Sequence, residues 1–300
     1  MSRAEPLEIT LRTLTPLWTG GVDGTTDRLH ETGLIGSLRW WYEALVRGLG
    51  GYACDPTSDD RCEYDPKKPT PPEKQLCVAC YLFGCTGWAR KFRLQVVDEQ
   101  GAIITEALDA GKKFTLRFVE LRPLDPAERW LLMKAVEIAV KYGALGGKTT
   151  LKPQKGAIGK DYGIVQCLQA DVVQKPDNLE GFLTQGRVLQ QEEFANLKWF
   201  FFIQKAFLSR LQMNPLLGLD ENGRPLPSLK NWQQFLQGRR GSKTENAVSK
   251  KIFSFRAGGR RIWGYAKNGQ MRDTIIEQIK RALGQGSYQV KTGEEVCNEL

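Results

Sequence analysis

Hydrophobic and polar residues alternate in three short stretches of the first half of the chain, at residues 7–12, 92–96 and 114–118. Successive side chains of a β-strand point to opposite faces of the sheet, so this period of two predicts half-buried strands. Residues 164–173 form a further run that is rich in strand-favouring residues. The pattern therefore predicts four strands in this half.

Two segments between these strands have the pattern of helices. In the first, Thr32 can cap a helix whose apolar residues continue to Val46, and glycines follow. In the second, Asp125 precedes a proline at the first helical position and Glu128 at the third, and the helix extends to Leu145. The element order is therefore β, α, β, β, α, β. This is the ferredoxin-like, or RRM-like, arrangement of two helices on one face of a four-stranded antiparallel sheet, whose other face can meet a ligand.

The second half of the chain has weaker patterns. They predict an amphipathic helix over residues 192–211, strands over 252–255 and 262–265, and a helix over 274–283. These elements alone do not define a topology.

The length of 300 residues favours two domains, at about 150 residues for each. We place an N-terminal α+β domain at residues 1–178, with a Cys-rich insertion at 52–86 and a Gly- and Lys-rich loop at 143–163, and a C-terminal domain at 179–300. No run approaches the roughly 18 apolar residues that a membrane span requires. The chain opens on charges and a proline instead of a signal sequence, so we expect a cytoplasmic protein.

Basic residues exceed acidic ones by 43 to 34, and they are concentrated in two segments. Residues 239–261 hold eight basic residues against one acid, Glu245, and residues 146–160 hold four lysines and no acid. Glycines in the second segment allow a ligand to approach the backbone closely, and lysines neutralise phosphates with release of counterions. The charge pattern predicts a polyanion as the partner, although an ordinary solvated loop is the alternative for the second segment.

The segment Gly146-Gly147-Lys148-Thr149 has the composition of a P-loop but not its pattern. A P-loop requires a glycine at the position that Tyr142 holds here. It also leads from a strand into a helix N-terminus, so that its amides point at phosphate, whereas this segment follows a predicted helix. Nucleotide hydrolysis at this segment is therefore excluded.

Four of the seven cysteines have a spacing that suits a metal ion. Cys54, Cys62, Cys77 and Cys80 are separated by seven, fourteen and two residues, and a terminal Cys-x2-Cys pair can place two thiolates on one tetrahedral zinc. A structural Zn²⁺ would supply folding free energy to a Pro-rich segment with few apolar residues. Cys85 is a competing ligand. The alternatives are unligated thiols in a mobile loop, or cysteines that act as small core residues.

Aromatic and cationic residues are adjacent in two places. Trp40 follows Arg39, and Trp88 lies close to Arg90 and Lys91. Proteins that bind single-stranded nucleic acids combine these residue types, because bases stack on rings and phosphates pair with cations. Packing of the tryptophans in the core is the alternative.

Several segments resemble one known family. Residues 32–48, TGLIGSLRWWYEALVRG, resemble the signature helix of the first Cmr subunits of type III-B CRISPR systems, which are members of the RAMP superfamily. Residues 82–92, LFGCTGWARKF, are similar to the LFG-x-TGW segment that follows cysteines in that family. Residues 146–163 resemble its glycine-rich loop, and residues 258–265, GGRRIWGY, are similar to its C-terminal element. The resemblance is therefore spread over most of the chain.

This resemblance implies two ferredoxin-like domains and a non-catalytic RNA-binding subunit of a type III CRISPR (Cmr) ribonucleoprotein effector complex that acts in antiviral defence. The implied partners are guide RNA and target RNA near the guide 3′ end, and other RAMP- or Cmr-type subunits, with no membrane. Together with the charge pattern, it leads us to expect RNA contacts from Arg39, Trp40, Arg90, Lys91, Lys148, Lys152, Lys155, Lys160, Arg256, Arg260 and Arg261.

Catalysis has little support in the sequence. His30 is the only histidine, which excludes a histidine pair and leaves at most a lone general base. Asp23 and Asp27 lie near it and could hold a metal ion, although such loop acids are more often turn residues. The chain is therefore predicted not to be an enzyme. The alternative is a metal- or His-dependent RNA endonuclease of the RAMP superfamily.

Overall fold

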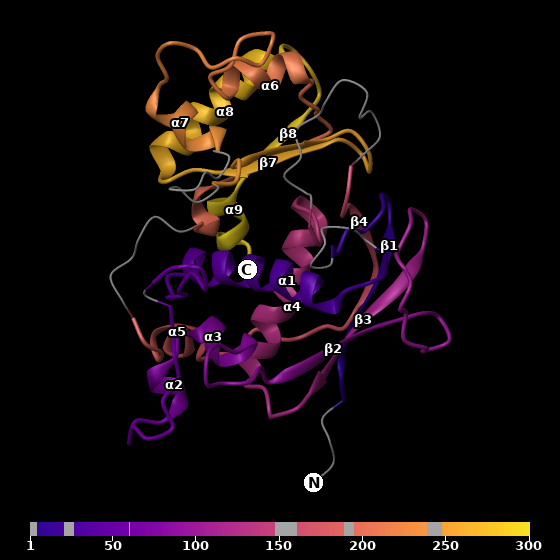
Figure 1. Ribbon diagram of the computed structural model, residues 1–300, viewed down its shortest axis with the longest axis vertical. Coiled ribbons are helices and arrows are strands. Elements are labelled where there is room, and N and C mark those ends of the chain that lie inside the picture. Colours follow the sequence, from indigo (N-terminus) through magenta and orange to yellow (C-terminus); the bar gives the residue numbers. More distant parts are fainter. Residues whose placement is uncertain (1–4, 21–26, 60, 148–160, 189–194, 239–247) are drawn as a thin grey trace. The chain divides into compact units, whose positions relative to one another are not determined.

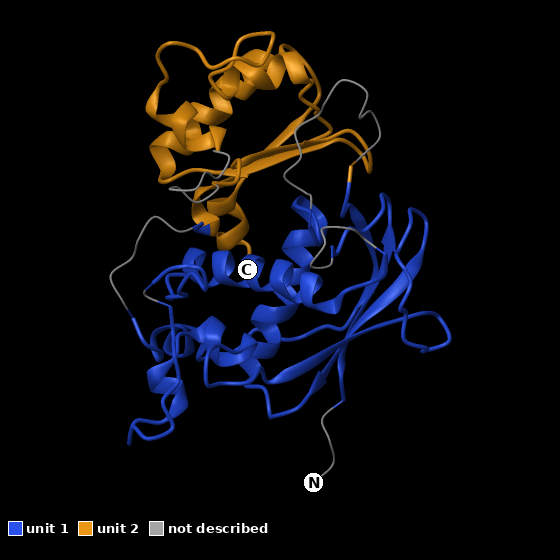
Figure 2. Ribbon diagram, in the orientation of Figure 1, with its two compact units in different colours: residues 1–147, 162–196 blue, residues 148–161, 197–300 orange. Residues whose placement is uncertain are grey.

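Figure 1 shows the helices and strands of the computed structural model, which describes residues 5–20, 27–59, 61–147, 161–188, 195–238 and 248–300. The chain divides into two compact units, coloured separately in Figure 2. Unit 1 comprises residues 1–147 and 162–196, and unit 2 comprises residues 148–161 and 197–300. Of the helices in the described part of the chain, none is long and apolar enough to cross a membrane.

Unit 1 contains a four-stranded antiparallel sheet in the order β2-β3-β1-β4. Its strands are β1 (Leu7–Thr13), β2 (Phe92–Val97), β3 (Lys113–Glu120) and β4 (Val165–Ala170). The strands predicted in this half are confirmed, and their order is that of the ferredoxin-like fold.

Two helices bury the apolar face of this sheet. Helices α1 (Glu31–Gly48) and α4 (Pro126–Tyr142) pack against each other on one side of the strands (Figure 1). Beneath them, Ile9 of β1 lies opposite Leu116 of β3, and both side chains are fully buried. The core of unit 1 therefore lies between this helix pair and the sheet.

The starts of the two helices differ in how well the sequence marks them. At α4, Asp125 accepts a hydrogen bond from the Ala127 amide, and Glu128 accepts one from the Asp125 amide, both at 2.8 Å, so the predicted cap is confirmed. At α1 the capping position is His30, whose side chain makes no capping hydrogen bond. The predicted cap at Thr32 is therefore wrong.

The Cys-rich insertion between α1 and β2 is folded. It contains α2 (Pro72–Gln75) and α3 (Val78–Phe83), and Leu76 between them is fully buried. The chain after β4 returns to this insertion, where the Arg187 amide donates to the Leu76 carbonyl oxygen at 3.0 Å. Helix α5 (Leu179–Thr184) also belongs to unit 1, which continues past residue 178, the predicted domain boundary.

Unit 2 contains a second four-stranded antiparallel sheet, in the order β6-β7-β5-β8. Its strands are β5 (Phe200–Gln204), β6 (Ile252–Phe255), β7 (Arg261–Tyr265) and β8 (Gln289–Thr292). Counted along each unit, both sheets have the same strand order. The predicted α+β fold class with two ferredoxin-like sheets is confirmed.

The helices of unit 2 are shorter, except for one. They are η1 (Leu197–Trp199, a 3-10 helix), α6 (Arg210–Leu216), α7 (Asn231–Gln237), α8 (Gly269–Leu283) and α9 (Gly293–Asn298). Apolar side chains of α6, α7 and α8 form one buried cluster with side chains from β5, β6 and β7. One face of this sheet is therefore packed against helices.

The helix predicted over residues 192–211 is wrong, because residues 200–204 form strand β5. Phe201 and Ile203 point into the helix-covered core, while Phe200 and Phe202 lie on the other face, and all four are at most 1% exposed. A run that is apolar on both faces has no alternation to distinguish a strand from a helix. The phenylalanines favour a strand, and pairing with β7 and β8 completes it.

Candidate metal centre and nucleic-acid interface

The four cysteines with metal-ligand spacing are brought together in the insertion of unit 1. The Sγ atoms of Cys54, Cys62, Cys77 and Cys80 all lie within 4.8 Å of one another, and all four residues are buried. Cys77 caps α3 and Cys80 lies in its first turn, so the short helix holds these two thiols side by side. The predicted clustering is confirmed.

The sulfur positions fit a tetrahedral ion. Four thiolates at about 2.3 Å from zinc lie about 3.8 Å from one another. Here the Cys54 sulfur is 3.4 Å from that of Cys80 and 3.7 Å from that of Cys77. The Cys77 amide donates to the Cys62 sulfur at 3.3 Å, and the Cys80 amide donates to the Cys77 sulfur at 3.4 Å. Such donors stabilise thiolates and orient them, so the residues present suit a thiolate-bound metal.

Helix α1 supplies two further groups to this centre. The Arg39 guanidinium donates to the Cys80 sulfur at 3.1 Å and to Glu43 at 2.7 Å. The Arg47 guanidinium donates to the carbonyl oxygens of Ala53 at 2.8 Å and Cys54 at 3.1 Å. These arginines therefore connect the helix to the cysteine-bearing segment.

The other three cysteines are not members of the four-sulfur cluster, but the side chain of Cys85 interacts with that of Cys80, which lowers the pKa of the Cys85 thiol. Cys85 is partly exposed, and its thiol donates to the Thr86 carbonyl oxygen at 3.6 Å. Cys167 is exposed on β4, and Cys297 is buried in α9. Among the described residues, the group of mutually close sulfurs consists of Cys54, Cys62, Cys77 and Cys80.

Two of the predicted RNA contacts have internal partners. Lys91 is only 4% exposed and forms an ion pair with Glu128, which is fully buried. The Arg39 guanidinium is held by Glu43 and by the Cys80 sulfur. Burial and these partners give both cations a structural role, so we no longer assign them to RNA.

Two tryptophans, the predicted RNA contact Trp40 and the nearby Trp88, also pack against protein groups. Trp40 lies edge to face against Trp41, with ring centroids 5.1 Å apart. The Trp88 ring has the Arg122 guanidinium 3.8 Å from its centroid and stacks on Tyr81 at 5.6 Å. The Trp88 ring therefore has two protein partners, the Tyr81 ring and the Arg122 guanidinium. Nearby, the Arg90 guanidinium donates to the carbonyl oxygen of Phe92 at 3.0 Å.

Four predicted contacts, Lys148, Lys152, Lys155 and Lys160, lie outside the described residues. The two ends of their loop are described and are joined by hydrogen bonds. The Leu145 amide donates to the Gly163 carbonyl oxygen at 2.9 Å, and the Gly147 amide donates to the Trp18 carbonyl oxygen at 2.7 Å. The residues that flank the loop, Gly147 and Gly163, are therefore hydrogen-bonded within unit 1.

Glycines at the loop ends are required by the chain itself. Gly163 has φ of +78°, and a Cβ there would lie 2.0 Å from the Leu145 carbonyl oxygen. A Cβ on Gly147 would lie 2.4 Å from the Trp18 ring. At these two positions the glycines make room for protein atoms.

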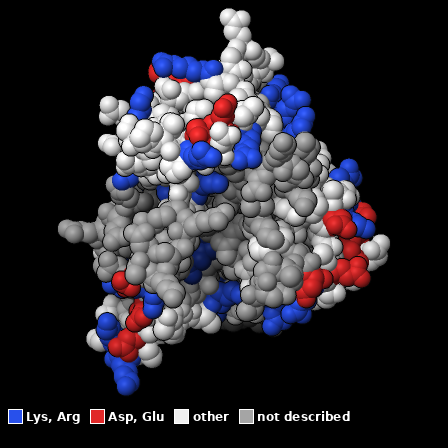
Figure 3. All heavy atoms as spheres, turned by 45° about the horizontal axis from the view of Figure 1, so that its top comes forward, with Lys and Arg blue, Asp and Glu red and all other residues white. Residues whose placement is uncertain are grey.

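Arg256 and Arg260 lie in the turn between β6 and β7 of unit 2, and Arg261 is the first residue of β7. Arg256 and Arg260 are exposed, whereas burial of Arg261 lowers the pKa of its guanidinium to about 10. Asp161, the residue after Lys160, accepts hydrogen bonds from the amides that follow β6. In Figure 3, lysine and arginine side chains form several separate groups on the face in view.

The residues considered for catalysis form one described contact. His30 Nε2 lies 3.1 Å from Asp27 Oδ1, and the hydrogen bond lowers the pKa of the exposed Asp27 carboxyl. Asp23 lies outside the described residues. Because the sequence has one histidine, no second histidine is available to act as a general acid or base beside this pair.

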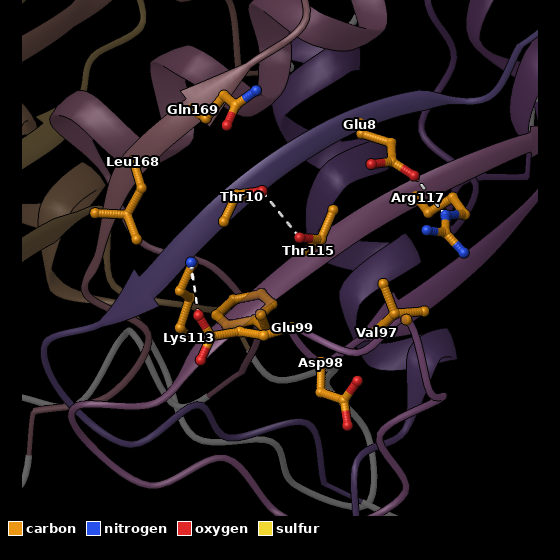
Figure 4. A pocket seen from close by; sticks show the side chains of 12 residues that line it. Glu8, Thr10, Val97, Asp98, Glu99, Lys113, Thr115, Arg117, Leu168 and Gln169 are labelled. Carbon is orange, nitrogen blue, oxygen red and sulfur yellow. Dashed lines mark hydrogen bonds and ion pairs between the residues drawn. The ribbon is translucent and has the colours of Figure 1, made fainter.

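Sequence reasoning missed a polar recess on the open face of the first sheet. The recess has a volume of about 370 Å³. Figure 4 shows the side chains that line it, which come from all four strands of this sheet and from the β2–β3 turn. Thr10 and Thr115 share a hydrogen bond of 2.9 Å at its floor, and Lys113 pairs with Glu99 at 2.7 Å. The sequence signal for this recess was the set of polar residues at alternate positions of the predicted strands.

Comparison with known proteins supports the resemblance seen in the sequence. Residues 10–151 match the family model of the RAMP superfamily. The fold is similar to the apo crystal structure of Cmr1 from Pyrococcus furiosus, with a TM-score of 0.52 and 11% identity over 97% of this chain and 100% of that chain. A chain of a type III-B Cmr-beta complex bound to cognate target RNA has a TM-score of 0.49 and 10% identity over 94% of this chain and 100% of that chain. No curated protein sequence matches this chain.

Proposed function

We propose that this chain, which has the fold of Cmr1 and matches the RAMP superfamily over residues 10–151, is a non-catalytic RNA-binding subunit of a type III CRISPR (Cmr) effector complex. The observation that carries the proposal is the agreement of both ferredoxin-like units, since the similarity to Cmr1 extends over 97% of this chain. Its partners are guide RNA, target RNA near the guide 3′ end and other RAMP- or Cmr-type subunits, and it acts in the cytoplasm.

The electrostatics of the chain support a role in binding a polyanion. The formal net charge is +9, and the exposed Arg256 and Arg260 follow the β6 strand. Asp161 holds the end of the lysine-bearing loop against that same turn. We assign the phosphate contacts to both segments, namely to Lys148, Lys152, Lys155, Lys160, Arg256 and Arg260.

The salt dependence of RNA binding tests this assignment. A protein that neutralises about six phosphates of a single strand has a log–log slope of affinity against salt near −4. Substituting Arg256→Gln and Arg260→Asn together removes two of these charges and brings the slope about 1.4 closer to zero. Asparagine suits position 260 because it tolerates the left-handed φ of 57° found there. Arg93→Gln, an exposed arginine of β2, is the control and leaves the slope unchanged. A flat salt response in the unsubstituted chain contradicts the proposal.

We further propose that the cysteine cluster holds a structural Zn²⁺. The four sulfurs, their spacing and the amide donors described above support a closed site with no position for substrate. Elemental analysis of the purified chain tests it, with one zinc per chain expected. Cys80→Ser loses the metal, whereas Cys167→Ser keeps it. Equal metal content in the two variants would rule out this site.

The rival function, an RNA endonuclease, has one favourable observation, the contact between His30 and Asp27. Labelled RNA incubated with the purified chain, with and without magnesium, distinguishes the two functions. We expect no cleavage in either condition. Cleavage that disappears in His30→Ala would overturn the non-catalytic assignment.

A further inference from the structure

The carboxylate of Asp161 is bound by main-chain amides of the turn after β6. The amides of Arg256 and Ala257 donate to the same oxygen, Oδ2, at 2.7 and 2.8 Å. Consecutive amides that converge on one oxygen form a nest, a concave main-chain site for anions. The turn thus presents an anion site that an internal carboxylate occupies.

The turn that carries the nest has an uncommon backbone conformation. After Ala257 the chain passes through positive φ values at Gly258 (63°), Gly259 (90°) and Arg260 (57°). Two of these residues are glycines, which adopt such angles without steric cost, whereas Arg260 does not. Its carbonyl oxygen accepts a hydrogen bond from Lys205, which also has a positive φ, of 62°. This main-chain hydrogen bond joins two exposed cationic residues, Lys205 and Arg260, at the turn that carries the nest.

The charges around the nest favour an anion with more charge than one carboxylate. Arg256, Arg260 and Lys205 are exposed, and within the described residues none of them forms an ion pair. Asp161 contacts the amides and leaves these guanidinium and ammonium groups to other ligands. The Arg256 guanidinium lies 5.9 Å from the centroid of the Phe207 ring, within the range of a cation–π contact.

We propose that the Arg256–Ala257 nest is a phosphate site for RNA, in which Asp161 is an internal stand-in for a phosphate oxygen. RNA and the end of the lysine-bearing loop then compete for the same amides. A phosphodiester replaces the carboxylate at the nest and gains the neighbouring cations, while Asp161 is released. This inference rests on the proposed RNA-binding function, and it adds a specific site and an internal competitor to it.

Affinity for a single-stranded RNA at fixed salt tests this competition in the full chain. Asp161→Ala empties the nest, and Asp161→Asn removes the charge but keeps an acceptor. The matched control is Asp220→Asn, a turn acid of the same unit whose carboxylate accepts from the Arg224 amide at 2.8 Å. Because charge-assisted hydrogen bonds to amides are strong, we expect Asp161→Ala to lower the Kd about tenfold and Asp161→Asn about threefold. We expect less than about a twofold change in Asp220→Asn, since its carboxylate accepts from the Arg224 amide and charges that do not contact the ligand are screened by salt.

Each outcome decides the proposal. Equal gains in Asp161→Asn and Asp220→Asn indicate a general charge effect and overturn it, and so does unchanged or weaker binding in both Asp161 variants. If Asp161→Ala does not fold, Asp161→Asn decides alone. If the unsubstituted chain binds no RNA, the proposed function has failed, and the nest is then tested with inorganic phosphate against chloride at equal ionic strength. In this test, phosphate is added to Asp161→Asn. Shifts of the Arg256 and Ala257 amide resonances on addition of phosphate, but not of chloride, support an anion site, and their absence overturns it.

Discussion

The two sheets share one strand order but differ on the face that lies opposite their main helices. In unit 1 this face carries Glu8, Thr10, Thr115 and Arg117, which line the recess of Figure 4. In unit 2 the corresponding face is aromatic and carries Phe200, Phe202, Phe253 and Trp263, all at most 4% exposed. The strand order sets where the strands lie. The residues at alternate positions decide whether the second face is polar or part of a core.

The units also differ in what holds their connecting segments. The insertion of unit 1 converges on four buried thiols, which have no counterpart among the described residues of unit 2. In unit 2 the connections between strands contribute apolar side chains to the core, such as Leu236 of α7. With the proposed Zn²⁺ bound, the insertion of unit 1 depends on a metal for its fold, whereas the connections of unit 2 depend on apolar packing. Substitutions in each unit can break or sharpen this contrast.

The largest effect is expected at the cysteine cluster. Cys80→Ser removes one thiolate from the proposed zinc site, and loss of a structural metal costs about 5 kcal/mol of the free energy of unfolding. Hydrogen exchange followed by mass spectrometry should show faster exchange in residues 52–86, with β5 to β8 unchanged. The control Cys167→Ser, on the exposed face of β4, should behave as the unsubstituted chain. Similar exchange in the two variants would show that the insertion does not need the metal.

The outer faces of the two sheets give the next contrast. Phe202→Ala should cost about 4 kcal/mol, because the ring is buried and its removal leaves a cavity. Thr115→Ala in unit 1 should cost only about 1 kcal/mol, since it loses one hydrogen bond at the partly exposed recess. Urea unfolding measures both. Comparable losses would mean that the two faces are equally important for stability, contrary to the comparison.

This contrast also explains which elements the sequence predicts. In β1 and β3 the polar outer face produces an alternating pattern, so those strands could be predicted. In β5 both faces are apolar, and the same reasoning led to a helix over residues 192–211. Strand β8 (Gln289–Thr292) is short and has no fully buried position, so it has no apolar pattern to detect. Local periodicity is therefore informative only where the two faces of an element meet different surroundings.

The candidate sites also differ in how far the sequence could predict them. The cysteine cluster could be predicted because ligand spacing within one short segment constrains a metal site. The role of Lys91 could not, because its partner Glu128 lies 37 residues away and burial of the pair depends on tertiary packing. The contact of Asp161 with Arg256 spans 95 residues. Charge counting located the basic segments but did not identify which cations have internal partners.

The buried pair of Lys91 and Glu128 gives a third, smaller effect. Lys91→Met should destabilise unit 1 by about 3 kcal/mol, because it leaves a buried carboxylate without its cation. Adding Glu128→Gln should restore part of the loss, since glutamine is neutral and keeps an acceptor for the helix cap. Thermal unfolding measures both variants, and the exposed Lys113→Met, which breaks the pair with Glu99, is the control. RNA affinity of folded Lys91→Met should equal that of the unsubstituted chain, and a clear loss would return this lysine to the RNA contacts.

The smallest effect compares one capping motif in two settings. Glu128 caps α4 and Glu295 caps α9, and each accepts a hydrogen bond from the amide of its capping residue. Burial raises the pKa of Glu128, whereas hydrogen bonds from Thr292 lower the pKa of the exposed Glu295.

The two shifts have opposite consequences for stability. A folded-state pKa below the ordinary value of 4.5 means that Glu295 contributes stability above pH 4.5, which is lost as the pH falls through the folded-state value. Because Glu128 is shifted upward, its contribution to stability instead decreases as the pH rises above 4.5. Glu295→Gln keeps the cap but removes the charge, so it should cost about 0.5 kcal/mol at pH 7, a value that allows for solvent screening. Urea unfolding at pH 7 and pH 3.5 should show this difference at pH 7 and a smaller one at pH 3.5. A difference independent of pH would mean that the carboxylate acts through its shape and not through its charge.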